Sequence, residues 1–207
     1  MEKPCPVWPN ETQPASLISV VSGLAKFQRF AEKNSKNHIL AVGDLKTWHG
    51  NIFRAVAPLA YYAGNFRADD AWRPCLRQDV TVGGASCAPF AAVPGMMDAL
   101  SQEMHELTVK TDEYIAKRPT PADRARAAIQ LAAVYAGKFI RIHPFLNGNG
   151  RMSRCIANYH FSRYDYPSPY YDPYARPGPD YAHANAACMA GDFSPLYRYL
   201  ISVLAAK

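Results

Sequence analysis

Apolar residues recur every three or four positions through most of the chain, which is the spacing of helices that bury one face. From Asp44, a candidate N-cap, this pattern predicts a helix that bends or ends at Pro58. A second helix is predicted over about 97–118. Thr120, followed by a proline and an acidic residue, is typical of a helix start, and the apolar face after it continues to Ile142. Most long segments are therefore predicted to be helical.

The rest of the pattern predicts further helices and one hairpin. A helix is expected from Gly150 to about Tyr164, and a last helix or pair of helices over about 180–204, after a proline-rich loop. Between the first two helices, Asp79–Val82 alternates in polarity and Gly83–Gly84 can turn the chain, which favours a short β-hairpin. Together these elements predict an all-α fold, one mostly helical domain with a single small β-hairpin.

Composition agrees with a globular domain. The chain has 207 residues, 49% of them hydrophobic and 19% charged, and is long enough to bury a core. No apolar run approaches the ~20 residues of a membrane span, and the N-terminus lacks the pattern of a secretory signal. The net charge of +6 comes without a long basic block, so neither nucleic acid nor a membrane is expected as a partner.

The five cysteines are widely spaced, and none forms a C-x-x-C pair. This pattern suggests neither a disulfide framework nor a zinc site, and it fits a reducing compartment. We therefore expect a cytoplasmic location, in the protein's own cell or in a cell into which it is delivered. Cys155 is expected in the core. Four histidines without ligand spacing are interpreted as packing or surface residues: His49, His105, His160 and His183.

One segment between two predicted helices combines a histidine, a glycine-rich turn and two arginines. Gly148 and Gly150 permit positive φ, so successive backbone N–H groups can face a phosphate, and the following helix adds its positive N-terminal end. Arg151 and Arg154 lie three positions apart on one helix face, where they can hold more than one phosphate. His143 can take a proton from a hydroxyl near neutral pH. These residues predict transfer of a phosphate-linked group to a hydroxyl.

The segment HPFLNGNGRMSR, residues 143–154, resembles the motif H-x-F-x-(D/E)-G-N-G-R-x-x-R of the Fic (filamentation induced by cAMP) domain family. The resemblance covers roughly residues 44–204. It implies a Fic-like catalytic domain over 44–207, with residues 1–43 as a helical extension packed on that core. Outside the motif, three parts of the chain resemble the family's helix before the hairpin, its target-docking flap and its closing helix: Trp48–Phe53 with Ala63–Arg67, Asp79–Pro94, and Gly191–Leu196.

Most characterised Fic proteins transfer AMP from ATP to a Ser, Thr or Tyr hydroxyl of a target protein and release pyrophosphate. The resemblance therefore implies a protein adenylyltransferase, with His143 as the general base and Phe145 as a core anchor of the loop. Val80, Thr81 and Val82 of the flap would hold the target segment as an added strand. The phosphate-binding roles follow the order of the motif: Gly148, Asn149 and Gly150 at the α-phosphate, Arg151 at the β-phosphate and Arg154 at the γ-phosphate.

One position departs from the family motif. Where Fic proteins have Asp or Glu to hold the magnesium ion that bridges the phosphates, this chain has Asn147, whose amide oxygen is a weaker ligand for a hard cation. Three alternatives stay open: AMP transfer with weaker magnesium dependence, a different donor that carries UMP, GMP or phosphocholine, and a non-catalytic protein that binds a nucleotide or a partner. The intact His143 argues against the third.

A second feature concerns regulation. Many Fic proteins carry an inhibitory helix with the motif (S/T)-x-x-x-E-(G/N), whose glutamate pairs with the second arginine of the loop. In this sequence no Ser or Thr stands four residues before a Glu. The resemblance therefore implies either an unrestrained enzyme or a separate small antitoxin-like protein that supplies this helix to Arg154, as in a toxin–antitoxin pair.

Overall fold

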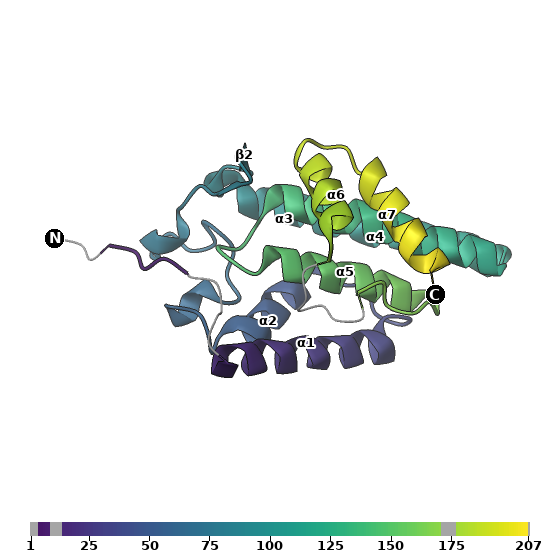
Figure 1. Ribbon diagram of the computed structural model, residues 1–207, viewed down its shortest axis with the longest axis horizontal. Coiled ribbons are helices and arrows are strands. Elements are labelled where there is room, and N and C mark those ends of the chain that lie inside the picture. Colours follow the sequence, from purple (N-terminus) through teal and green to yellow (C-terminus); the bar gives the residue numbers. More distant parts are fainter. Residues whose placement is uncertain (1–3, 9–13, 171–176, 207) are drawn as a thin grey trace.

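The computed structural model describes residues 4–8, 14–170 and 177–206. Seven α-helices form most of that part of the chain (Figure 1). They are α1 (Pro14–Asn34), α2 (Val42–Phe53), α3 (Val93–Lys117), α4 (Pro121–Ile142), α5 (Asn149–Arg163), α6 (Pro179–Met189) and α7 (Ser194–Ala205). Short 3-10 helices add η1 (Ala60–Tyr62), η2 (Pro74–Leu76) and η3 (Phe90–Ala92). The prediction of an all-α fold with one small hairpin is confirmed.

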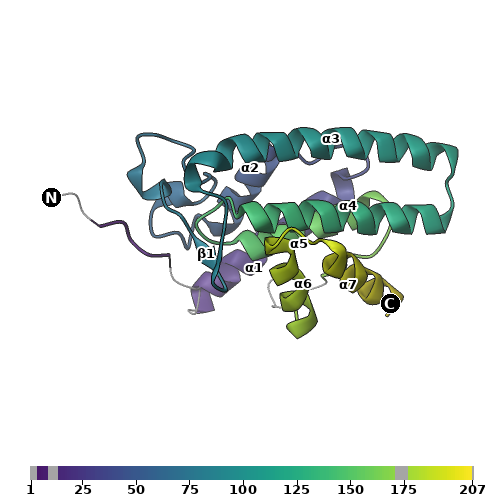
Figure 2. The ribbon, with the colours of Figure 1, turned by 90° about the horizontal axis from the view of Figure 1, so that it is seen from above.

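α5 lies in the middle of the bundle, with α1 on one side and α4 on the other (Figure 1). α3 and α4 run side by side as a long pair (Figure 2), and α6 and α7 pack on each other and on α4. The apolar faces read from the sequence point inward, since Ile52, Met97 and Ile156 are all buried. In the described part of the chain, no helix has both the length and the apolar character needed to cross a bilayer.

The start of α2 differs from the sequence prediction. Asp44 is not the N-cap. The N-cap is Ala41, and Asp44 is the third residue of the helix, where its carboxylate accepts the backbone N–H of Ala41 at 2.8 Å. An acidic side chain can cap a helix from inside the first turn as well as from before it, and the pattern alone does not separate the two. The helix also ends at Phe53, before Pro58, and the chain after η1 turns rather than continuing as a helix.

The predicted hairpin is confirmed and is very short. β1 (Thr81–Val82) and β2 (Ala85–Ser86) pair antiparallel, with Thr81 opposite Ser86. Gly83 and Gly84 both have positive φ, 57° and 84°, which a two-residue hairpin turn with this twist requires. Among the described residues β1 pairs only with β2, so the other edge of β1 is open.

Cys5 and Cys75 form a disulfide, and the expectation that the cysteines form none was wrong. The two residues are 70 positions apart, and they meet only because the N-terminal segment folds back onto η2. Tyr62 fixes that segment, since its hydroxyl donates to the Pro6 carbonyl at 3.1 Å and its ring stacks with Trp8. The inference of a reducing compartment rested on free cysteines and loses its support. Cysteine spacing carried no signal of this pairing.

Cys5→Ser is expected to lower the free energy of unfolding by about 3 kcal/mol without reductant, because the unfolded chain regains the freedom of a long loop. Urea unfolding followed by circular dichroism measures this loss. Cys87→Ser removes a free, half-buried thiol instead and is the matched control, with an expected change below about 1 kcal/mol. A Cys5→Ser protein as stable as the wild type would show that the disulfide does not stabilise the fold.

Candidate functional site

His143 directly follows α4 and has a left-handed backbone conformation, with a φ of 54°. A residue with a Cβ pays roughly 1–2 kcal/mol for this conformation, and residues held under strain by their surroundings cluster at functional sites. The ring Nδ1 lies 3.3 Å from the carbonyl oxygen of Ile140. Because a carbonyl oxygen only accepts, Nδ1 carries the ring proton and Nε2 keeps its lone pair. His143 is therefore set up as a proton acceptor at Nε2.

Burial lowers the pKa of His143 to about 4. The hydrogen bond to Ile140 opposes this shift, and the positive charge of Arg67 adds to it. The ring is therefore neutral at pH 7, but a base with so low a pKa is weak. Phosphate groups bound nearby would raise the pKa, because their negative charge stabilises the protonated ring.

Arg67 is completely buried and joins the end of α4 to the hairpin. Its guanidinium donates to the carbonyl oxygens of Ile142 and His143, and to those of Gln78 and Ala88 on the two sides of the hairpin. The last carbonyls of a helix have no hydrogen-bond partner within the helix, and they carry the negative end of its dipole. A cation at this end donates hydrogen bonds to these carbonyls and also stabilises their negative charge. Arg67 thereby fixes the hairpin relative to the candidate base.

Asn149 closes the turn that follows His143. Its side chain donates to the Phe145 carbonyl at 2.8 Å and accepts the Phe145 N–H at 3.0 Å. Phe145 is fully buried, with its ring against Phe66 and Phe139, so the loop is anchored in the core. α5 begins at Asn149, and the first turn of a helix offers N–H groups and positive potential to an anion.

His49, from α2, supports this loop from the core. Its Nδ1 accepts the N–H of Gly64 at 2.9 Å, so Nε2 carries the proton and donates to the Asn147 carbonyl at 3.0 Å. Burial lowers the pKa of His49 to about 3 against the opposing effect of the Asn147 hydrogen bond, so the ring is neutral. It also stacks on Phe145, with ring centres 3.6 Å apart. His49 therefore fixes the peptide that precedes Gly148.

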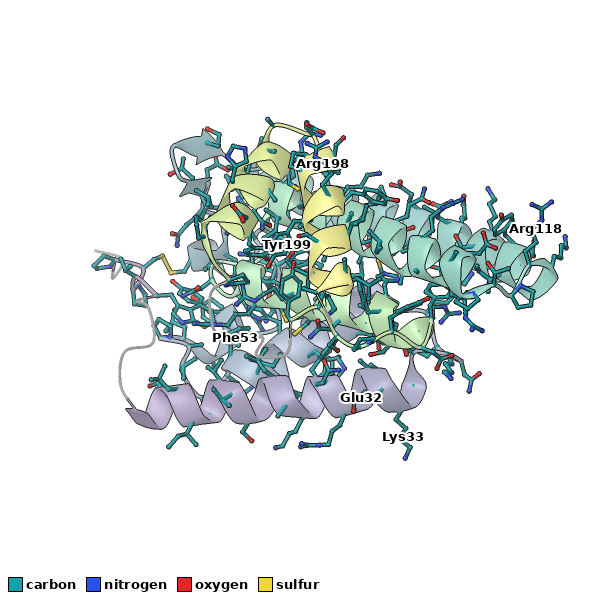
Figure 3. The ribbon with its side chains drawn as sticks, turned by 45° about the vertical axis from the view of Figure 1, so that its right-hand side comes forward. Glu32, Lys33, Phe53, Arg118, Arg198 and Tyr199 are labelled. Atoms are coloured by element: carbon teal, nitrogen blue, oxygen red, sulfur yellow. A yellow bond between two sulfur atoms is a disulfide. The ribbon has the colours of Figure 1, made fainter. Side chains whose placement is uncertain are left out.

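The two arginines of the loop lie in different surroundings. Arg151 is half-buried, and its guanidinium carbon lies 5.6 Å from the ring centre of Phe53, which points into the bundle beside α5 (Figure 3). Arg154 is only 3% exposed and lies 5.8 Å from the ring centre of Tyr181 on α6. Arg151 is therefore accessible in this conformation, and Arg154 is covered.

Comparison with known proteins covers this whole site. Residues 39–161, more than half of the chain, match the model of the Fic/DOC family, and they include the loop together with His49 and Arg67. The chain belongs to the Fic/DOC family. A Fido domain-containing protein of Dictyostelium discoideum is 36% identical over 72 residues, which are 35% of this chain and 46% of that protein. The match thus spans about half the length of this curated relative.

Two solved structures share the fold. A Fic domain containing signaling protein from Bacteroides thetaiotaomicron has 20% identity and a TM-score of 0.53, with 92% of this chain and 71% of that chain covered. The BepC protein of Bartonella tribocorum, a VirB-translocated effector solved with bound AMPPNP, has 14% identity and a TM-score of 0.59. That match covers 98% of this chain and 94% of the BepC chain. Identities this low establish the fold alone.

The sequence analysis predicted most of the loop of this Fic/DOC chain but missed two residues that support it, His49 and Arg67. The structure brings His143, Phe145 and the start of α5 together, as the motif implied, and the hairpin residues Val80–Val82 lie on the segment that Arg67 ties to α4. His49 was interpreted only as a packing or surface residue. His49 and Arg67 both lie in segments that resemble the family. That resemblance was the one signal in the sequence that could have identified them as functional residues.

Asn147 stands where the family motif has an acidic residue. Its side-chain oxygen accepts the N–H of Gly148 at 2.6 Å and is therefore turned toward the loop's own backbone. Within the described residues, no group of three or more His, Cys, Asp or Glu side chains is placed to hold a metal ion. The loop does not fit a magnesium site of its own, and the mechanism below uses no metal held by the protein.

Gly148 has a φ of 80°, and a Cβ there would lie 2.7 Å from a ring carbon of Phe53 and 3.1 Å from Nε2 of His49. Gly148→Ala is expected to cost about 3 kcal/mol of stability, because the left-handed backbone and the clash with buried rings both oppose it. Gly83→Ala is the matched control, since φ is also positive but nothing lies within 4 Å of its Cβ, and about 1 kcal/mol is expected. Urea unfolding compares them, and equal losses would contradict tight packing of the loop on α2.

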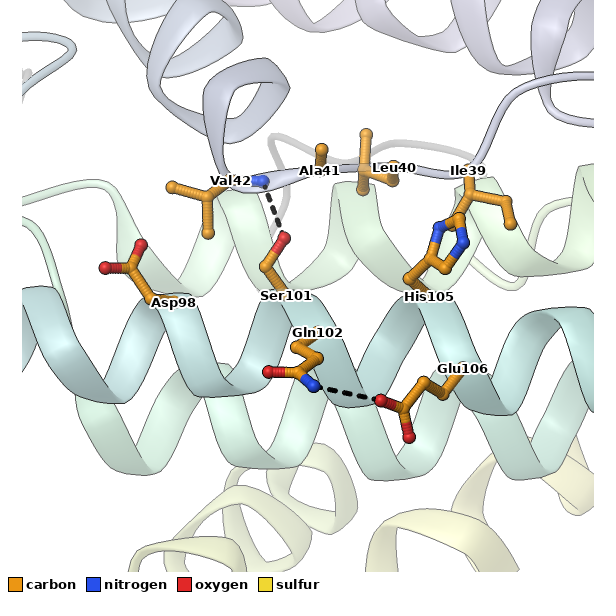
Figure 4. A pocket seen from close by; sticks show the side chains of 9 residues that line it. All are labelled: Ile39, Leu40, Ala41, Val42, Asp98, Ser101, Gln102, His105 and Glu106. Atoms are coloured by element: carbon orange, nitrogen blue, oxygen red, sulfur yellow. Dashed lines mark hydrogen bonds between the residues drawn. The ribbon is translucent and has the colours of Figure 1, made fainter.

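A separate cavity of about 440 Å³ lies between the chain segment Ile39–Val42 and α3 (Figure 4). The Ser101 hydroxyl accepts the N–H of Val42 at 3.2 Å across it, and His105 and Glu106 line it further along α3. None of its lining residues belongs to the loop or to its supports. This cavity is therefore not part of the candidate site.

Proposed function

We propose that this protein transfers AMP from ATP to a Ser, Thr or Tyr hydroxyl of a target protein and releases pyrophosphate. The observation that carries the proposal is the neutral His143, with Nε2 as its proton acceptor, on the short loop that leads into α5, whose first N–H groups can bind an anion. Membership of the Fic/DOC family, the resemblance of residues 143–154 to the loop of AMP-transferring members, and the AMPPNP bound to BepC support it.

In this proposal His143 acts as the general base. Its Nε2 takes the proton of the acceptor hydroxyl while the hydroxyl oxygen attacks the α-phosphorus of ATP. The bond from the α-phosphorus to the oxygen that bridges to the β-phosphate breaks, and pyrophosphate leaves with the bonding electrons. The proton on His143 then passes to solvent, which restores the neutral ring.

The start of α5 holds the phosphates. Backbone N–H groups of Gly148–Gly150 and the positive helix end stabilise the negative charge on the α-phosphate in the transition state. Arg151 neutralises the β-phosphate and the departing pyrophosphate. The N–H groups need a fixed orientation for this role, and His49 supplies it by holding the Asn147 carbonyl just before them.

The hairpin presents the acceptor. An extended target segment can pair with the open edge of β1, so that Val80–Val82 read the target's backbone more than its side chains. Because Arg67 joins both sides of the hairpin to the end of α4, a strand bound there lies at a fixed position relative to His143. The acceptor hydroxyl is then selected by its register along the strand.

Asn147 favours a second candidate, the same transfer chemistry with a donor that carries UMP, GMP or phosphocholine. An amide does not supply the negative charge with which a carboxylate holds magnesium against a triphosphate. A donor bound chiefly through its other groups would depend less on that ion. The identity of the donor nucleotide therefore has to be determined by experiment.

Transfer of label from the α-phosphate of ATP, GTP, CTP or UTP to lysate proteins, with magnesium present, tests the proposal. Asn147→Asp is expected to speed AMP transfer at least about ten-fold, because the carboxylate binds magnesium more strongly. Asn37→Asp, on the exposed turn after α1, makes the same charge change away from the loop and should leave the rate unchanged. Label from UTP or GTP but not from ATP would favour the second candidate. An absence of label with both the wild type and Asn147→Asp would contradict nucleotide transfer.

A further inference from the structure

The N-terminal segment, residues 4–8, contacts the site from outside the region that matches the family model. Its contact residue is Trp8, whose ring centre lies 6.0 Å from that of His49 and 6.2 Å from that of Phe53. Aromatic pairs attract each other at these distances. Both partner rings are completely buried, whereas residues 4–7 are exposed. The packing of the segment is therefore concentrated at Trp8.

His49 and Phe53 are two of the side chains that hold the loop between His143 and α5. His49 donates to the Asn147 carbonyl at 3.0 Å, and a Cβ on Gly148 would lie 2.7 Å from the ring of Phe53. Protein interiors are close-packed, so a ring that loses a neighbour can shift, and the groups packed on it shift with it. Trp8 therefore influences, through two rings, the orientation of the N–H groups at the start of α5.

The Cys5–Cys75 disulfide, drawn in yellow in Figure 3, holds the N-terminal segment in place. Tyr62 contributes as well, because its ring stacks with Trp8 at 6.0 Å. Cys75 and Tyr62 belong to a small buried cluster against which Leu146 of the loop packs. A mostly exposed segment gains little from burial, so the time it spends at this position depends on its covalent attachment. Breaking the disulfide is expected to release Trp8.

We propose that Trp8 is a positioning residue for the loop and that the Cys5–Cys75 disulfide makes its action depend on the redox state. While the disulfide is intact, Trp8 packs on His49 and Phe53, and the N–H groups keep the orientation that the donor's phosphates need. Reduction releases the N-terminal segment, and transfer slows. The inference rests on the proposed function in one respect, namely that these N–H groups bind the donor's phosphates.

A dithiol reductant can perform this release. Cys5 is exposed and Cys75 is only 8% exposed, so a thiolate of the reductant attacks Sγ of Cys5. The bond between the two protein sulfurs breaks, and the Cys75 sulfur leaves with the bonding electrons and takes up a proton. The second thiol of the reductant then attacks the reductant's sulfur in the mixed disulfide, which frees Cys5 as a thiol. The two cysteines gain two electrons and two protons, and the dithiol becomes a disulfide.

Rates of label transfer from ATP, measured with and without dithiothreitol, test the inference. The reduced wild type is expected to lose at least about ten-fold in kcat, because misdirected N–H groups stabilise the transition state less. Its affinity for ATP, measured by calorimetry, should change less than about three-fold, since these groups contribute more in the transition state than in the ground state. Cys87→Ser keeps the disulfide and should respond to the reductant as the wild type does.

Variants at Trp8 separate this effect from other consequences of reduction. Trp8→Ala should be slow without reductant and should lose nothing further when it is reduced. Trp8→Phe should stay within about three-fold of the wild type, because it keeps a ring and because Nε1 of Trp8 has no hydrogen-bond partner among the described residues. Trp72→Ala, at a position that is 92% exposed, is the matched control and should keep the wild-type rate and response.

Hydrogen exchange measures the orientation of the loop without any nucleotide. In the reduced wild type and in Trp8→Ala, the amides of residues 144–150 are expected to exchange at least about ten-fold faster than in the oxidised wild type. The amides of residues 127–137, in the buried part of α4, should keep their rates. This second region distinguishes a loosened loop from an unfolded protein.

Four outcomes overturn the inference. They are loop exchange that reduction leaves unchanged, an active enzyme whose kcat does not respond to reduction, a Trp8→Ala protein that still responds to the reductant, and faster exchange in α4 as well. The last outcome would mean that reduction loosens the whole fold. The expected exchange rates with no AMP transfer in any sample would instead contradict only the proposed function, so the two failures are distinguishable.

Discussion

His143→Ala is expected to lower AMP transfer by roughly 10²–10⁴-fold, the usual contribution of a positioned general base. The affinity for ATP should change little, because the start of α5 and Arg151, not the imidazole, hold the phosphates. Initial rates of label transfer give kcat, and calorimetry gives the ATP affinity. The effect is thus expected in kcat, the signature of a group that acts only as the hydroxyl is deprotonated.

The pH profile checks the same assignment independently. The pKa of His143 is lowered to about 4, so its base form is already present well below neutral pH. kcat/KM should therefore stay flat from about pH 8 to about pH 5.5, where an ordinary histidine base would already lose activity. His183→Ala, on the exposed side of α6, is the control and should retain full activity. Undiminished AMP transfer by His143→Ala would show that His143 is not the general base.

The helices were predictable because their signals are local. Thr120 caps α4 as its sequence implied, with its hydroxyl accepting the N–H of Asp123, and α5 begins one residue before the predicted Gly150. The glycine pair of the hairpin has the positive φ values that a two-residue turn needs. Each of these features depends on neighbours within one turn of the chain, and a periodic pattern records them.

The supports of the site were not predictable in the same way. Arg67 bonds carbonyls that lie 75 and 76 positions later, and His49 bonds one 98 positions later. No local pattern marks an arginine as buried or a histidine as holding a distant peptide. Arg154 shows the reverse: its spacing from Arg151 suggested a shared ligand, but Arg154 is buried and lies close to Tyr181 on α6, a contact that the spacing does not record. Tertiary contacts, not local propensities, determine the burial and the bonding partners of these residues.

Acid is expected to destabilise the fold steeply, by about 4 kcal/mol per pH unit between about pH 6 and pH 4. Burial lowers the pKa values of His49 and His160 to about 3 and that of His143 to about 4. The unfolded chain therefore binds protons on these three residues below about pH 6.5 while the folded chain does not. Their contribution is complete above that pH and is lost as the pH falls toward 4. Urea unfolding at several pH values measures the slope.

His160→Phe isolates one of the three contributions. His160 stacks on Tyr135, and neither of its ring nitrogens has a hydrogen-bond partner among the described residues. A phenyl ring keeps the stacking and removes two unsatisfied polar atoms, so the variant should be at least as stable as the wild type at pH 7. Its slope should fall by about one third, since each site contributes about 1.4 kcal/mol per pH unit. His183→Phe, at an exposed position, should leave the slope unchanged, and an unchanged slope in His160→Phe would show that His160 is not held neutral by burial.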